Sequence, residues 1–173
     1  PVLASGHSPA LNKFYRQHKK GSEIQNIKVP GWLIRFGGKI ANKHAGSEDD
    51  KMALDLLKKV GTVRFMYSED GSKIPAKDIK KLQESLRREN FDDLIMIRSG
   101  AMDFKLMIRE QDGNITELFM LYNDREEGEM AFISAKTKLH LDDLKRLLKK
   151  EMGQKLQPYF DIEEEPEEVE PIL

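Results

Sequence analysis

Histidine is the first residue type in this chain that could carry chemistry, because it binds metals and transfers protons near neutral pH. The sequence holds four histidines: His7, His18, His44 and His140. No two of them have the i, i+4 spacing that places a pair of metal ligands on one helix face. The first three fall in charged stretches, and His140 stands where a helix is expected to begin. We therefore expect surface positions for the first three, a capping role for His140, and no metal site.

The serine, glycine and acidic motifs lack the context that catalysis requires. Ser99-Gly100 has no Gly-x-Ser-x-Gly motif around it. Phe36-Gly37-Gly38-Lys39 resembles a phosphate-binding loop, but the Gly-x4-Gly-Lys spacing and the Ser or Thr after the lysine are missing. Three acidic pairs stand where helices or strands should begin, and capping explains them: Asp49-Asp50, Asp92-Asp93 and Asp142-Asp143. The chain has no cysteine, which excludes disulfides and thiol nucleophiles. The sequence thus predicts no catalytic, cofactor-binding or metal-ligating residue, and no cofactor.

Two rows of basic residues could bind an anionic partner. The first lies on one side of an expected helix: Lys77, Lys80, Lys81, Arg87 and Arg88. It lacks the interleaved aromatic residues of a base-stacking surface, so we expect a solvated helix face and no nucleic-acid binding. The second row, Arg35, Lys39 and Lys43, accompanies Trp32 and Phe36 in an amphipathic pattern. Core packing of Trp32 is the favoured interpretation, and a membrane-surface or partner-helix contact is the alternative.

The elements that position these residues follow from hydrophobic periodicity. Helical spacing predicts helices over Ala10–Lys20 and Trp32–Asn42, after Ser47, after Pro75, and over Leu141–Lys150. Apolar runs or alternation predict strands over Ile24–Val29, Thr62–Tyr67, Leu94–Arg98, Met102–Arg109, Ile115–Tyr122 and Met130–Ala135. Asp112-Gly113 predicts a hairpin turn, because this pair readily takes positive φ. This order predicts an α+β fold, with a mainly antiparallel sheet of about five or six strands and helices packed on one face.

The size and composition of the chain fit one globular domain. It has 173 residues, of which 39% are hydrophobic and 34% charged. The formal net charge of -1 hides a split, since residues 1–160 carry +6 and residues 161–173 carry -7. We predict a flexible N-terminal segment over residues 1–9, a single α+β domain over 10–152, and an acidic, proline-containing tail over 153–173. A solvated tail is the favoured interpretation, and an interaction tail or a mask over the basic body is the alternative.

The opening residues carry a weak export signature. Val2 and Ala4 would suit the positions -3 and -1 of a signal-peptidase site, with cleavage before Ser5. Residues 1–9 could therefore include the remnant of a signal peptide, and an arbitrary boundary of the sequence is the alternative.

Several short runs resemble a known family. They are Asp92-Asp93-Leu94, Met102-Asp103-Phe104, Gly113-Asn114-Ile115-Thr116-Glu117-Leu118 and Leu141-Asp142-Asp143-Leu144. Together with the order of the earlier elements, from Asn12-Lys13-Phe14-Tyr15 to Val63-Arg64-Phe65, they resemble domain-of-unknown-function family 4252, small exported proteins of Bacteroidota. The resemblance covers about residues 10–150. Lys136-Thr137-Lys138 departs from the pattern, because a glycine is expected before the last helix, and the acidic tail looks like an addition.

The resemblance implies an exported α+β domain, often with a lipoprotein-type signal and encoded near extracytoplasmic-function sigma factors and their anti-sigma partners. No activity is assigned to the family, so no catalytic residue is carried over. We therefore expect a non-enzymatic domain in the periplasm or at the outer membrane that binds a protein partner, in envelope stress signalling. It would reach a membrane only through an N-terminal lipid anchor that this chain does not contain.

Two other functions stay open at this point. A carrier of a small apolar ligand or lipid could line an adaptable cavity with methionines: Met96, Met102, Met107, Met120 and Met130. A carboxylate-based hydrolase would need two acidic side chains that face each other across a cleft.

Overall fold

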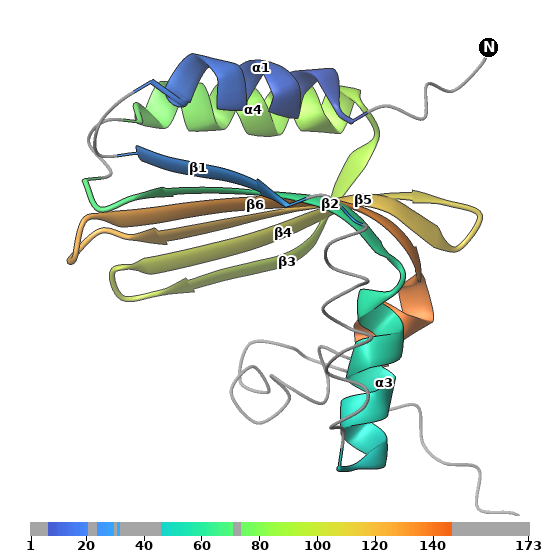
Figure 1. Cartoon of the computed structure of the whole chain (residues 1–173). Helices are drawn as coiled ribbons and strands as arrows, with labels where there is room; N and C mark the ends of the chain where they lie inside the picture. The colour runs from blue at the N-terminus through green and yellow to red at the C-terminus, as the bar shows by residue number, and fades with distance from the viewer. Residues whose placement is uncertain (1–6, 21–23, 30, 32–45, 71–73, 147–173) are drawn as a thin grey trace, which may run out of the picture.

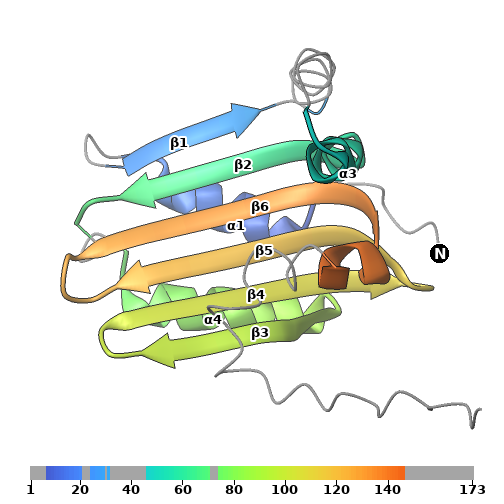
Figure 2. The same ribbon diagram turned by 90° about the horizontal axis from the view of Figure 1, so that it is seen from below.

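A six-stranded antiparallel sheet is the centre of the computed structural model, which describes residues 7–20, 24–29, 31, 46–70 and 74–146 (Figure 1). The strands lie in the order β1-β2-β6-β5-β4-β3 (Figure 2). Their bounds are β1 Ile24–Val29, β2 Val60–Ser68, β3 Phe91–Ser99, β4 Met102–Gln111, β5 Asn114–Asp124 and β6 Glu129–His140. The predicted α+β fold with a mainly antiparallel sheet is confirmed.

Tight turns join β3, β4, β5 and β6 into a meander of neighbouring strands. The predicted hairpin at Asp112-Gly113 lies between β4 and β5, and both residues have positive φ, 53° and 78°. A Cβ at Gly113 would lie 3.0 Å from the ring of His140, which adds a steric reason for glycine. β2 completes the sheet between β6 and β1, antiparallel to both.

Helices lie on both sides of the sheet. α1 (Pro9–His18) and α4 (Ala76–Arg88) lie side by side on one face (Figure 1). The expectation of helices on one face holds for these two. α3 (Glu48–Leu57) and the helical residues 141–146 instead contribute Leu56 and Leu144 to the cluster of buried side chains on the opposite face. None of the described helices is long and apolar enough to cross a membrane.

The sheet alternates its side chains between two apolar clusters. The cluster under α1 and α4 contains Leu11, Phe14, Tyr15, Met66, Ile74, Leu82, Leu86, Phe91, Met107, Phe119, Leu121, Met130 and Phe132. The cluster on the opposite face contains Leu56, Ile95, Ile97, Leu106, Ile108, Ile115, Leu139 and Leu144. A two-sided core of this kind requires both faces of the central strands to be apolar, as the long runs in β4 and β5 are.

Capping explains where several helices begin. Ser47 Oγ accepts the backbone N–H of Asp50 at 3.1 Å, as the sequence predicts for α3. At the end of β6, His140 N–H donates to Asp143 Oδ2 at 3.2 Å, and His140 Nδ1 accepts the N–H of Asp142 at 3.3 Å. The capping role predicted for His140 is confirmed. Because β6 runs to His140, the strand continues through Lys136-Thr137-Lys138, five residues beyond the predicted end at Ala135.

Several sequence predictions lie outside the described residues. They are the helix over Trp32–Asn42 with its basic row, the phosphate-loop-like run, the export signature, and the acidic tail over 153–173.

We expect Phe132→Ala to lower the free energy of unfolding by about 3–5 kcal/mol. Phe132 is fully buried, and its ring centroid lies 5.0 Å from that of Phe14 and 6.4 Å from that of Phe119. Urea unfolding followed by circular dichroism measures the change. Met96→Ala is the matched control, because Met96 is 65% exposed, and it should change the free energy by less than about 0.5 kcal/mol. Equal effects of the two substitutions would contradict the assignment of the core.

Candidate functional site

The histidines do not converge in the described part of the chain. His7 Nδ1 lies 3.7 Å from Glu117 Oε1, and His18 Nε2 lies 3.5 Å from Asp78 Oδ2. His140 belongs to the cap at the end of β6, and His44 lies outside the described residues. No group of three or more His, Asp or Glu side chains able to hold a metal ion occurs among the residues that the structure describes.

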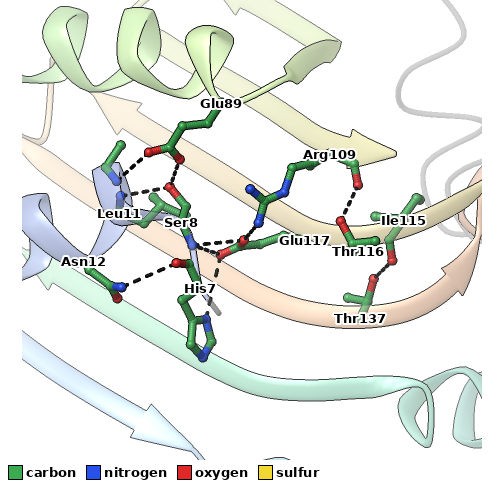
Figure 3. Close-up of polar contacts among 11 residues, drawn as sticks. His7, Ser8, Leu11, Asn12, Glu89, Arg109, Ile115, Thr116, Glu117 and Thr137 are labelled. Carbon is green, nitrogen blue, oxygen red and sulfur yellow. Dashed lines mark hydrogen bonds and ion pairs between the residues drawn. The ribbon is translucent and has the colours of Figure 1, made fainter. Parts of the chain in front are cut away.

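A buried carboxylate, Glu117 on β5, is the centre of the polar cluster that the structure brings together (Figure 3). Its two oxygens each accept the backbone N–H of Ser8 at 3.1 Å. Oε2 also accepts a hydrogen bond from Nη2 of Arg109 at 2.5 Å, across the β4–β5 register that pairs the two residues. The guanidinium of Arg109 lies 5.1 Å from the ring centroid of Phe91, which helps to hold it toward Glu117.

A second carboxylate, Glu89, completes the cluster from the end of α4. Ser8 is the N-cap of α1, and its Oγ accepts the N–H of Leu11 at 3.2 Å while its hydroxyl donates to Glu89 Oε2. Glu89 Oε1 accepts the N–H of Ala10 at 2.9 Å. Two carboxylates therefore bind the N-terminal end of α1, where the helix dipole favours negative charge. His7 and Ser8, which fall in the N-terminal segment predicted over residues 1–9, take part in this cluster, and Ser8 is fully buried.

Burial dominates the electrostatics of the cluster. Burial raises the pKa of Glu117, against the opposing effects of the Ser8 N–H and of Arg109. Burial, followed by the nearby charges of Arg64, Lys136 and Lys28, lowers the pKa of His7 to about 4. His7 is therefore neutral at pH 7, and its approach to Glu117 is not an ion pair there.

The cluster has the chemistry of an anchor. A general acid or base must reach the substrate proton directly or through one water. The side chain of Glu117 is 1% exposed, and both of its oxygens are occupied by donors of this chain. We assign the cluster to holding α1 on the sheet. The sequence contained one signal for this cluster. Glu117, Phe119 and Leu121 stand at every second position of the strand, so all three side chains point to the same buried side.

A shallow hollow lies between α1 and α4, with a volume of about 80 Å³. Its lining residues are Ala10, Lys13, Phe14, Gln17, Asp78, Lys81, Leu82 and Ser85. Pockets for drug-sized ligands have volumes of about 300 Å³ or more, so this hollow admits only a small group. The methionines that a carrier would use do not gather there. Met107 and Met130 are in the cluster under α1 and α4, Met120 packs on the opposite face, and Met96 is exposed.

Aromatic side chains gather on the sheet face opposite α1 and α4, the side that Figure 2 shows. The register places Tyr67, Ala131, Tyr122 and Phe104 in one row across β2, β6, β5 and β4, and Phe65 lies beside Tyr67 in the next row. We call Phe65, Tyr67, Phe104 and Tyr122 the aromatic face. All four are partly exposed. The rings of Phe65 and Tyr67 are stacked, with centroids 6.2 Å apart.

The charged side chains that contact the aromatic face are acidic. Tyr67 donates its hydroxyl to Glu129 Oε1 at 2.9 Å, which raises the pKa of Tyr67, and Tyr122 donates to Asp124 Oδ2 at 3.4 Å. In the described strands, side-chain alternation puts no Lys or Arg in the rows of the aromatic face. The surface is therefore apolar with an acidic edge.

The comparison with known families shows which family this chain belongs to. A family model described as a domain of unknown function (DUF4252) matches residues 15–147. The chain belongs to the DUF4252 family. Neither a curated protein nor a solved structure is significantly similar to it. Glu117, Arg109 and the aromatic face all lie within the DUF4252 match, whereas Ser8, which caps α1, precedes it.

We expect Glu117→Ala to destabilise this DUF4252 domain by about 3–5 kcal/mol, because Arg109 and the Ser8 N–H both lose their buried partner. Urea unfolding measures the loss, and hydrogen exchange should show faster exchange at the amides of Ser8 and Leu11. Glu110→Ala is the matched control, since Glu110 is exposed and accepts the N–H of Gly113 in a local turn, and we expect a loss below about 1 kcal/mol. Unchanged exchange at α1 in Glu117→Ala would contradict the anchor role.

We expect His7→Asn to flatten the acid side of the stability profile of this DUF4252 domain. The pKa of His7 is about 6.5 in the unfolded chain and about 4 in the folded protein. Between these values the unfolded chain binds the proton more tightly, so the free energy of unfolding is highest above about pH 6.5 and falls as the pH falls toward 4. The raised pKa of Glu117 acts in the opposite direction and is common to both proteins.

Chemical unfolding at several values between pH 7 and pH 4 measures this effect. The wild type should lose on the order of 2 kcal/mol more than His7→Asn over that range. Met96→Ala, at an exposed side chain that does not titrate, is the control and should follow the wild type. Parallel profiles of the wild type and His7→Asn would show that the burial of the ring does not control its protonation.

Proposed function

We propose that this chain is a non-enzymatic exported domain that binds a protein partner at the cell envelope through its aromatic face. The proposed contact is made by Phe65, Tyr67, Phe104 and Tyr122. Export and a role in envelope stress signalling are part of the same proposal, and they rest on the resemblance to the family alone.

The single observation that carries partner binding is a row of partly exposed aromatic side chains on one face of the sheet. The rows of the aromatic face extend to Ile27 on β1, whose side chain is 49% exposed. Tyrosine and other aromatic residues are enriched in protein interfaces, because they combine a large apolar ring with a small loss of conformational entropy. Tyr67 and Tyr122 also present hydroxyl groups that are held by carboxylates and are thus already oriented.

The acidic edge defines the chemistry of the partner segment. Asp124 and Glu129 flank the two tyrosines, and the described strands offer no cation in these rows to offset them. A segment that places apolar side chains over the rings and Lys or Arg over the two carboxylates matches this surface. An anionic segment would meet like charge at its edge.

The buried cluster supports the non-enzymatic part of the proposal. Glu117 and Glu89 both accept hydrogen bonds from the N-terminal end of α1. A hydrolase would require one of two such groups to meet a substrate and a water. Both carboxylates instead hold α1 on the sheet.

Site-specific photo-crosslinking tests the proposed surface in the cells that make the full chain. We expect a photoreactive phenylalanine analogue at Tyr67 or Tyr122 to form a covalent adduct with one defined protein, identified by mass spectrometry. The same analogue at Met96 is the matched control, because Met96 is exposed and lies on the other side of the sheet. Adducts with lipid instead of protein would support the carrier function, and identical adducts from Tyr67 and Met96 would refute the proposed surface.

Substitutions then test the energetics with the purified partner. Tyr67→Ser combined with Tyr122→Ser should weaken the affinity at least about tenfold, whereas Met96→Ser should leave it unchanged. Asp124→Asn with Glu129→Gln should weaken binding less and reduce its dependence on salt. An affinity that survives the double tyrosine substitution would contradict the aromatic face as the binding surface.

A further inference from the structure

The outward surface of the helix layer is strongly basic. The nine cations of α1, α4 and the two residues after α1 are all exposed: Lys13, Arg16, Lys19, Lys20, Lys77, Lys80, Lys81, Arg87 and Arg88. We call them the basic helix face. The same segments contain two acidic residues, Asp78 and Glu84. The sequence pattern showed the basic row of α4 alone. The basic residues of α1 join that row because the two helices lie side by side (Figure 1).

Few of these charges are neutralised within the protein. In the part of the chain that the structure describes, Arg87 is the one member of the basic helix face with an ion pair, to Asp93 at 3.0 Å. Asp78 lies 3.5 Å from His18 Nε2 and thus faces α1 rather than the outer lysines. A surface with this excess of cations attracts anions over about a Debye length.

The hollow between α1 and α4 lies within this surface and has groups suited to a phosphate. Lys13 and Lys81 provide a cation from each helix, and Gln17 and Ser85 provide polar side chains. Asp78 also lines the hollow and is the one acidic group there, so the two lysines leave it with a net positive charge. Its volume of about 80 Å³ admits a phosphate-sized group, while Phe14 and Leu82 close it toward the core.

We propose that the basic helix face binds an anionic phospholipid surface, with a lipid phosphate seated between Lys13 and Lys81. The interaction goes beyond the proposed partner binding and does not depend on it. The helix layer and the aromatic face are opposite sides of one sheet, so a domain held to lipid by its helices has the aromatic face on the side away from the lipid (Figures 1 and 2).

Lipid fits the basic helix face better than other polyanions. Single-stranded nucleic acid is bound by cations together with exposed aromatic rings, and the exposed residues of α1 and α4 include no aromatic side chain. A protein interface has an apolar centre that excludes water. The large exposed apolar residues among those described are Ile27, Leu57 and Met96, and none belongs to α1 or α4. Lysines spread over two adjacent helices, without an apolar centre, suit adsorption to headgroups.

Vesicle flotation of the full chain tests the proposal. We expect binding to phosphatidylcholine vesicles that contain about 30 mol% phosphatidylglycerol, little binding to pure phosphatidylcholine, and release at about 0.5 M NaCl. Each basic side chain near such a surface contributes about fivefold to the partition coefficient, so Lys13→Glu with Lys81→Glu should reduce it roughly 30-fold or more. Both side chains are exposed, and circular dichroism verifies that the variant folds.

Matched charge changes separate the surface from net charge. Lys138→Glu with Lys145→Glu alters the net charge equally at two exposed residues outside the basic helix face and should retain most of the binding. The milder Lys77→Gln with Lys80→Gln should give an intermediate loss. Equal losses from the two Glu pairs, or no binding to anionic vesicles, would overturn the proposal. Tighter binding to a single-stranded oligonucleotide, lost in Lys13→Glu with Lys81→Glu, would assign the surface to nucleic acid instead.

Discussion

The structure depends on the compensation of one buried charge. A carboxylate removed from water is strongly unfavourable unless donors surround it, and Glu117 lies at 0% exposure beneath α1. Its donors are Arg109 from the neighbouring strand and the N–H of Ser8 at the start of α1. Because the second donor is backbone, it fixes the position of the first turn of α1 on the sheet. Leu11, Phe14 and Tyr15 then enter the core from a helix whose end is already held.

The placement of α1 determines the two surfaces of the molecule. Once α1 lies beside α4 on one face, the apolar sides of both helices are buried and their charged sides face outward together. The other face of the same strands keeps its aromatic side chains, with Tyr67 and Tyr122 tied to acidic residues. Cations on one side and apolar and acidic groups on the other follow from the same packing arrangement.

The helices, strands and turns could be predicted because they depend on residues close in the sequence. The polar cluster at Glu117 could not be predicted, because it depends on residues far apart in the sequence. The turn at Asp112-Gly113, the cap at Ser47 and the cap at His140 each depend on residues a few positions apart, so the sequence suffices for them. The cluster at Glu117 joins residues separated by 109 positions, and the pairing of β2 with β6 also joins segments far apart in the sequence. Alternation along β5 could flag Glu117 as a buried charge, but nothing in the sequence pattern identifies Ser8 as its partner.

Register in β5 links the anchor to the aromatic face. Side chains alternate along the strand, so Glu117 and Phe119 point to the helix layer while Met120 and Tyr122 point away. A register irregularity between Ile115 and Glu117 lets Ile115 join the opposite cluster, although two residues so spaced in a regular strand would share a face. A slip of one residue would move Glu117 and Phe119 to the opposite face and turn Tyr122 toward the helix layer. The Glu117–Arg109–Ser8 contacts oppose that slip, and the same contacts that dock α1 therefore keep the aromatic row on the outer face.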